Sequence, residues 1–263
     1  MKIKFFIITY NNNEILNDWI LKSISKSKYD KNNVDFYVID NHSNAEINDE
    51  YKDLVKLIPN SLRPDFSTGH LSRNYNEAII NSFEDLNDPK CDVVITCQND
   101  TILCENWYEE VLKHLESYKY ICVGHGDQFQ VFTPESIKEI GIFDERFCNL
   151  GYHEADFFIR ACIYYREHSS INDIAHNRQL NPIDQKILID TPSGSSRNDE
   201  SHLLSKEYHD ITRKLFFIKW RVRTHTWGVN PIFVDIEPLI LSHFYYPYFE
   251  KNINNLKEKK YLV

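Results

Sequence analysis

Residues 93–101 read VVITCQNDT, an apolar run that changes abruptly into polar side chains. The same change follows Ile3–Ile8, which leads into Thr9-Tyr10-Asn11, and Val34–Ile39, which leads into Asp40-Asn41. Short apolar runs that are rich in β-branched residues and end in polar residues are typical of strands with both faces buried. The sequence therefore predicts three buried strands, each with a polar carboxyl end.

Helical periodicity lies between and after these runs. Apolar residues recur at spacings of three and four over residues 15–24, 71–83 and 107–115. Alternation of strands and helices favours a mostly parallel sheet with right-handed crossovers, in a Rossmann-like α/β fold. Ligands of such sheets bind beyond the carboxyl ends of the strands, so the three polar ends are candidates for one site.

The second part of the chain has a different pattern. Residues 128–132 resemble a further strand, and Thr133-Pro134 is expected to open a short helix that Gly141 closes. Another helix is predicted from Glu154 to Arg166, and residues 169–201 are predicted to be mainly loop. We expect one α/β domain over residues 1–200 and a helical C-terminal appendage over residues 201–263.

Composition limits the classes of function. A formal charge of -9 over 263 residues argues against nucleic-acid binding, which needs a basic face. No apolar stretch is long enough to span a bilayer, and the apolar run at residues 5–8 is too short for a signal peptide, so we expect a cytoplasmic protein. The six cysteines form no CxxC pair, which indicates reduced thiols rather than a zinc site or disulfides.

Glycine-rich phosphate loops are missing from the sequence. The turn after the first strand, at residues 10–13, has no glycine, and Gly124-His125-Gly126 lacks the third glycine of a dinucleotide fingerprint. A diphosphate would then be held through a carboxylate and a hard divalent cation. Asp100, directly after a buried strand, is the candidate ligand, and the alternative is that Asp100 caps the next helix.

Six segments, in order, resemble motifs of family 2 glycosyltransferases. The segment Gln98–Thr101, with Trp107 downstream, is similar to the NNDT…W variant of the family's DxD motif. Ile7–Asn11 is similar to the family's YN turn, and Val38–Ser43 is similar to its (V/I)D(D/N)xS segment. Gly69–Asn74 is similar to GxxxARN, Ile140–Phe147 to GGFDExF, and His153–Arg160 to EDxDLxxR. The resemblance covers residues 3–160, and Lys219-Trp220 is similar to a C-terminal KW element.

The resemblance implies a GT-A fold and a hexosyltransferase-type activity (EC 2.4) of the inverting kind, from a nucleoside-diphosphate sugar to a glycan or other hydroxyl acceptor. UDP-sugars are the favoured donors, and Mn²⁺ or Mg²⁺ is the expected cofactor. Residues 1–110 would bind the nucleotide and residues 111–200 would face the acceptor. The implied metal ligands are Asp100 and His176, and the implied nucleotide-binding residues are Thr9, Tyr10, Asn11, Asp40, Arg73 and Asn99.

The general base is expected in the EDxD-like segment, where this chain departs from the family. Glu154 stands at the position of the family's base, His153 replaces the preceding Glu, and Gln98 replaces the first carboxylate of DxD. Asp156 is the alternative base, but Asp156 and Arg160 are spaced to pair on the helix surface. We therefore favour Glu154 as the base.

Two other functions stay open. One is a catalytically inactive module that binds sugar nucleotides, as the substitutions at Gln98 and His153 would allow. The other is a nucleotidyltransferase, for which a glycine-rich, basic first turn would be expected. The aromatic run at residues 244–249 could contact a peripheral membrane surface or an acceptor sugar, although packing of its rings against the core is the favoured interpretation.

Overall fold

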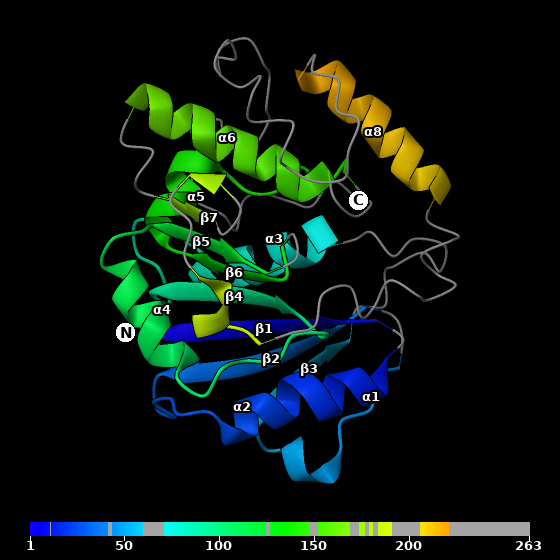
Figure 1. Cartoon of the computed structure of the whole chain (residues 1–263), viewed down its shortest axis with the longest axis vertical. Coiled ribbons are helices and arrows are strands. Elements are labelled where there is room, and N and C mark those ends of the chain that lie inside the picture. Colours follow the sequence, from blue (N-terminus) through cyan, green and yellow to red (C-terminus); the bar gives the residue numbers. More distant parts are fainter. Residues whose placement is uncertain are drawn as a thin grey trace.

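The computed structural model describes residues 1–10, 12–41, 44–59, 71–124, 127–147, 152–168, 174–176, 179–180, 184–190 and 206–220. In these residues a central sheet carries helices on both faces (Figure 1). The mostly parallel α/β architecture predicted from the sequence is confirmed.

The described strands form one eight-stranded sheet in the order β3-β2-β1-β4-β6-β5-β7-β8. Their bounds are Ile3–Thr9 (β1), Val34–Asp40 (β2), Val55–Pro59 (β3), Val93–Gln98 (β4), Tyr120–Val123 (β5), Phe129–Phe132 (β6), Ile174–His176 (β7) and Gln179–Leu180 (β8). Strands β1 to β4 are mutually parallel, whereas β6 runs antiparallel to both β4 and β5. The start of β6 therefore lies at the same edge as the end of β4.

The helices agree with the predicted periodicity. They are α1 (Asn13–Ile15), the π-helical η1 (Leu16–Leu21), α2 (Lys22–Lys26), α3 (Leu71–Phe83), α4 (Trp107–Leu115), α5 (Pro134–Ile140), α6 (Tyr152–His168) and α8 (Lys206–Trp220), with 3₁₀ turns η2 (Asp49–Tyr51) and η4 (Gln185–Ile187). Helix α5 begins with a capping box between Thr133 and Ser136, and Gly141 ends it at a φ of 89°, where a side chain would be strained.

Strand β1 separates two apolar clusters because its side chains alternate between the faces of the sheet. Phe6 and Ile8 pack with α3, α5, α6 and α8, whereas Phe5 and Ile7 pack with η1 and α4. On the second face Trp107 meets Phe5 edge-on at 5.3 Å, and its indole Nε1 donates a hydrogen bond to Ser27 Oγ at 2.9 Å. These contacts hold both helical layers against the strands that end in polar residues.

Residues 169–201, predicted to be mainly loop, also contain short regular elements. The described part of this segment contains β7, β8 and η4, and β7 extends the sheet by pairing with β5. The predicted helix at 154–166 is also longer, because it begins at Tyr152 and ends at His168. The aromatic run at residues 244–249 lies outside the described residues.

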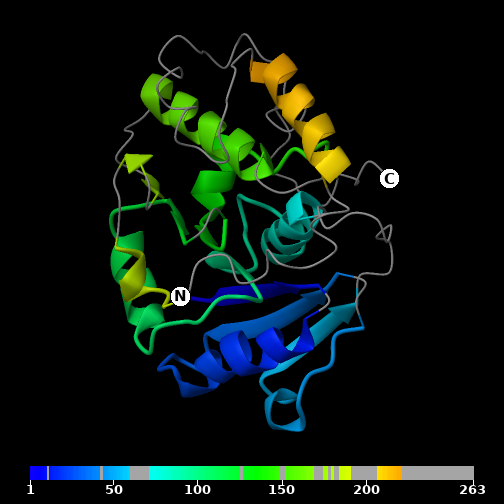
Figure 2. The ribbon, with the colours of Figure 1, turned by 45° about the vertical axis from the view of Figure 1, so that its right-hand side comes forward.

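Helix α8 lies beside α6, as Figures 1 and 2 show from two directions. Its buried residues Phe216 and Trp220 belong to the same apolar cluster as α6. None of the described helices is both long enough and apolar enough to cross a membrane.

Candidate functional site

The polar ends of β1 and β4 are joined by hydrogen bonds. Asn99 Nδ2 donates to Thr9 Oγ1 at 3.0 Å, and the backbone amide of Asn99 donates to the Ile8 carbonyl at 3.1 Å. The amide of Asn41, after β2, donates to the Thr9 carbonyl at 2.9 Å. Three strand ends that lie far apart in the sequence therefore form one polar edge, as the sequence predicts.

Asp127 connects this edge to two helices. Its Oδ1 accepts a hydrogen bond from Gln98 Nε2 at 2.8 Å, and its Oδ2 lies 2.6 Å from both the Tyr75 hydroxyl and His153 Nε2. Asp127, Tyr75 and His153 are almost completely buried. Residues from β4, α3, α6 and the segment before β6 thus meet at one carboxylate.

The electrostatics of this cluster favour an ionised Asp127. Burial opposes its charge, but the charge of His153 and the hydrogen bonds from His153 and Tyr75 hold the pKa of the carboxyl below its ordinary value. Burial, followed by the nearby Asp127 charge, raises the pKa of the Tyr75 hydroxyl well above its usual value. At neutral pH the Asp127 carboxylate therefore accepts hydrogen bonds, and Tyr75 stays a neutral donor.

Asp100 lies at the end of β4 and is buried. Gln128, beside Asp127, donates a hydrogen bond from Nε2 to the Asp100 carbonyl at 3.0 Å and so holds the turn. Helix α4 begins only at Trp107, with Asn106 at its N-cap position. The alternative interpretation of Asp100 as the cap of that helix is therefore wrong.

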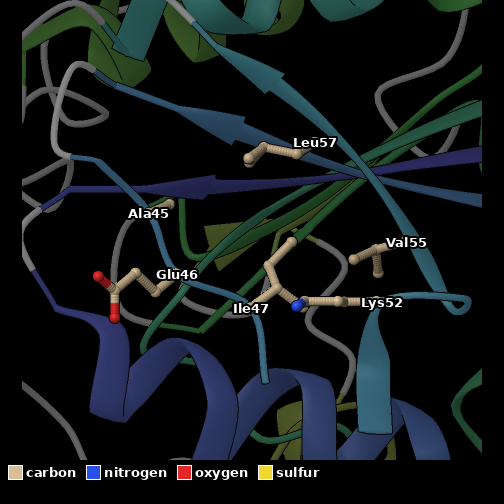
Figure 3. A pocket seen from close by; sticks show the side chains of 6 residues that line it. All are labelled: Ala45, Glu46, Ile47, Lys52, Val55 and Leu57. Carbon is tan, nitrogen blue, oxygen red and sulfur yellow. The ribbon is translucent and has the colours of Figure 1, made fainter. Parts of the chain in front are cut away.

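Asp40 ends β2, and its Oδ2 accepts a hydrogen bond from the Ala45 amide at 2.9 Å. This contact ties the following loop to the strand beside a pocket of about 550 Å³, lined by Ala45, Glu46, Ile47, Lys52, Val55 and Leu57. Figure 3 shows Ile47 in the middle of this set, with Glu46 on one side and Val55 on the other. The pocket lies at the β3 edge and shares no lining residue with the Asp127 cluster.

The remaining nucleotide-site residues are only partly brought together. Tyr10 follows β1 and is half-buried, whereas Asn11 lies outside the described residues. Arg73, in the first turn of α3, is half-buried. Burial raises the pKa of the nearby Glu77 and Glu145 carboxyls, and the charge of Arg73 partly offsets this effect in both. His176 is the last residue of β7, where it pairs with Cys122, and only its backbone is described.

Asp156 lies in a buried ion cluster between α6 and α8. Arg160 Nε lies 3.1 Å from its Oδ2, Trp220 Nε1 donates to its Oδ1 at 2.9 Å, and Lys219 Nζ also pairs with Oδ1. Lys219 reaches Asp144 as well, at 2.8 Å. The predicted pairing of Asp156 with Arg160 is observed, but its expected place on the helix surface is wrong, because both side chains are buried.

Glu154 stands in the first turn of α6, next to His153, and is partly exposed. Its charge contributes to the raised pKa of Tyr75, after burial and Asp127, so it lies near the Asp127 cluster. Of the two candidate bases, Glu154 has access to solvent, whereas Asp156 is enclosed by cations and an indole.

Sequence reasoning missed Asp127 and Tyr75. In the sequence Tyr75 is only an apolar position of an amphipathic helix, and Asp127 immediately precedes the predicted strand at 128–132. An antiparallel orientation of that strand would have placed Asp127 at the polar edge. No feature of the local sequence determines this orientation, which arises from the sheet as a whole.

The carboxylate and amide oxygens at this edge are of the type that hard divalent cations prefer as ligands. Within the part of the chain that the structure describes, no group of three or more His, Cys, Asp or Glu residues could hold a metal by itself. Mg²⁺ and similar ions commonly take one or two protein carboxylates and complete their shell with phosphate and water. A buried Asp100 with the Gln98 amide two residues before it agrees with such a shared site.

Comparisons with known proteins show the fold. No family model matches the sequence, and no curated protein matches it. Among solved structures, residues 1–349 of S. aureus TarS in complex with UDP share 12% identity at a TM-score of 0.51, covering 83% of this chain and 65% of that one.

A mannosyltransferase, PcManGT from Pyrobaculum calidifontis, in complex with GDP-Man and Mn²⁺, shares 13% identity at a TM-score of 0.50, covering 75% of this chain and 59% of that one. The structure of the longer S. aureus TarS chain has the same TM-score of 0.50, with 39% of its length covered. This chain therefore spans less than two thirds of each of these proteins. Together with the sheet order, these similarities confirm the GT-A fold that the sequence resemblance implied.

Proposed function

We propose that this protein is a metal-dependent glycosyltransferase, similar to family 2, that moves a hexose from a nucleoside-diphosphate donor to an acceptor hydroxyl. The observation that carries the proposal is the polar edge of the GT-A sheet. There the Gln98-Asn99-Asp100 turn is hydrogen-bonded to Thr9, and the first turn of α6 brings Glu154 near the same edge. Such an edge is where ligands of open α/β sheets bind.

The donor is a nucleotide sugar, with UDP-sugars favoured. We assign the base and ribose to Tyr10, Asn11 and Asp40, and the diphosphate side to Thr9, Asn99 and Arg73. The hydrogen bond between Asn99 and Thr9 supports this assignment because it joins two of the residues on the diphosphate side. That TarS was solved with UDP and PcManGT with GDP-Man supports a nucleoside-diphosphate ligand.

Asp100 and His176 are the proposed protein ligands of Mn²⁺ or Mg²⁺. A cation there would neutralise negative charge on the departing diphosphate. The Mn²⁺ in the PcManGT complex supports a divalent metal in this fold. Arg73 would add a fixed positive charge on the α3 side of the same diphosphate.

Glu154 is the proposed general base, in an inverting displacement at the anomeric carbon. A base must reach the proton of the acceptor hydroxyl, which enters from solvent. Glu154 is partly exposed in the first turn of α6, whereas Asp156 is occupied by Arg160, Trp220 and Lys219. We therefore assign Asp156 to holding α8 against α6. The division into a domain at 1–200 and an appendage at 201–263 belongs to the same proposal.

A donor panel tests the function. UDP- and GDP-sugars are incubated with the protein in Mn²⁺ or in EDTA, and released nucleotide is measured. We expect slow release from at least one donor in Mn²⁺, with water as the acceptor, and none in EDTA. Tight donor binding without release from any donor would instead indicate an inactive binding module. A glycan acceptor and a cytoplasmic location complete the proposal.

A further inference from the structure

The Gln98 side chain occupies the first position of the D-x-D spacing, where an amide replaces a carboxylate. An amide has a donor end and an acceptor end, and the two are exchanged by a half-turn about its last torsion. A cation at this site could be bound by the oxygen Oε1 but would be repelled by the NH₂ group. The orientation of Gln98 therefore decides whether position 98 can contribute to the site.

Asp127 determines that orientation. The Nε2 end of Gln98 donates a hydrogen bond to Asp127 Oδ1 at 2.8 Å, so the NH₂ group is the end of the amide that faces Asp127. This contact turns the NH₂ group inward, so the oxygen is the end of the side chain left for a ligand.

The carboxylate of Asp127 is itself firmly held. It accepts from Tyr75 and faces His153 Nε2, each at 2.6 Å, and all three side chains are almost completely buried. Short hydrogen bonds to an ionised group in a buried position are stronger than neutral ones. Asp127 cannot rotate to release Gln98 without breaking these contacts.

We infer that Asp127 is a positioning residue, which holds Gln98 so that its amide oxygen faces the metal-bound diphosphate beside Asp100. The inference rests on the proposed function. It explains how the site can bind a metal although Gln98 and His153 stand at two positions where the resemblance predicts carboxylates. The negative charge is on Asp127, which accepts a hydrogen bond from Gln98, and His153 Nε2 lies 2.6 Å from the same carboxylate.

A charge transposition tests the inference. In the double variant Gln98→Glu/Asp127→Asn, the amide introduced at position 127 can donate to the carboxylate introduced at position 98, while its oxygen accepts from Tyr75 and His153. Every hydrogen bond of the cluster is thereby kept, and the negative charge moves to position 98. Each single variant disrupts this set of hydrogen bonds. Asp127→Asn allows the Gln98 amide to rotate by a half-turn, and Gln98→Glu places two carboxylates at hydrogen-bond distance in a buried site.

The probe is UDP or GDP, whichever binds the wild-type protein more tightly. Calorimetry measures its affinity for each variant, once with Mn²⁺ and once in EDTA. Loss of a residue that orients a metal ligand typically weakens metal affinity ~10–100-fold. We expect Asp127→Asn to weaken binding by about this factor in Mn²⁺ but not in EDTA, and the double variant to recover most of the loss. Tyr120→Phe is the matched control: it removes a buried tyrosine hydroxyl that donates to Gln130 Oε1 at 2.7 Å and not to Asp127, and it should leave the Mn²⁺-dependent gain unchanged.

Thermal unfolding of the unliganded variants gives an independent readout. The melting temperature of the double variant should exceed that of both single variants, because only the double variant restores complementary partners. Equal loss of nucleotide affinity with and without Mn²⁺, or a double variant that binds no better than Asp127→Asn, would overturn the inference alone. A wild-type protein that binds neither nucleotide would overturn the proposed function, and the inference with it.

Discussion

Asp156→Asn tests whether the ion cluster between α6 and α8 is structural. The change removes the charge that faces Arg160 at 3.1 Å and Lys219, and it weakens the hydrogen bond from Trp220 at 2.9 Å. Breaking a buried ion pair typically costs ~3–5 kcal/mol. Here Lys219 keeps Asp144 at 2.8 Å, and Arg160 keeps its hydrogen bond to the Ile142 carbonyl at 2.9 Å. We therefore expect a loss near the lower limit, ~3 kcal/mol.

In a domain of this size, ~3 kcal/mol corresponds to a fall in melting temperature of ~6–12 °C. Differential scanning calorimetry of the unliganded variant measures it. Asp210→Asn is the matched control, since Asp210 and Arg213 form a helical pair at 3.1 Å that is about half exposed, with 47% and 45% of the side chains accessible. Such a pair contributes below ~1 kcal/mol. An Asp156→Asn melting temperature as high as that of the control, combined with lost activity, would refute the structural role and make Asp156 the base.

Three further changes probe the site and the cluster. Asp100→Asn should nearly abolish Mn²⁺-dependent nucleotide release with little change in melting temperature, and release that continues undiminished in EDTA would exclude a metal requirement. Asp40→Ala should weaken binding of the free nucleoside diphosphate in calorimetry, whereas unchanged affinity would make Asp40 a structural residue of the loop. Although burial opposes it, Arg146 and Lys219 lower the pKa of Asp144 to about 2. Because the folded-state pKa is depressed, this stabilisation is complete above the ordinary value of 3.8 and is lost as pH falls toward about 2, so acid unfolding of Asp144→Asn should be less steep over that range.

The parallel half of the sheet could be predicted from local sequence because its strands are continuous apolar runs. That signal lies in Ile3–Ile8, Val34–Ile39 and Val93–Ile95, and the polar ends of these runs indicate a candidate binding edge. The edge strand β3, with exposed Lys56 and Leu57, lacks the signal and was not predicted. Strand β7 lies in a polar segment without a strand pattern, and it could not be predicted because its pairing with β5 is between residues distant in sequence.

Single candidate residues could be selected from the sequence, whereas contacts among residues that lie far apart in the sequence could not. Asp100 and Glu154 are marked by their positions after a strand and at a helix start. The burial of Asp156 depends on Lys219 and Trp220, which lie more than sixty positions further along the chain and meet it only when α8 packs on α6. Local spacing predicted the Arg160 partner but could not predict that the pair is buried.

Donor hydrolysis by Glu154→Gln is the most direct test of the central claim that this polar edge transfers sugar with Glu154 as the base. The substitution is nearly isosteric, and Glu154 is placed on the acceptor side, so donor affinity measured by calorimetry should be unchanged. The rate of nucleotide release at saturating donor and Mn²⁺ should fall by ~10²–10⁴, the usual contribution of a positioned base. A Glu154→Gln protein that releases nucleotide at the wild-type rate would contradict the account.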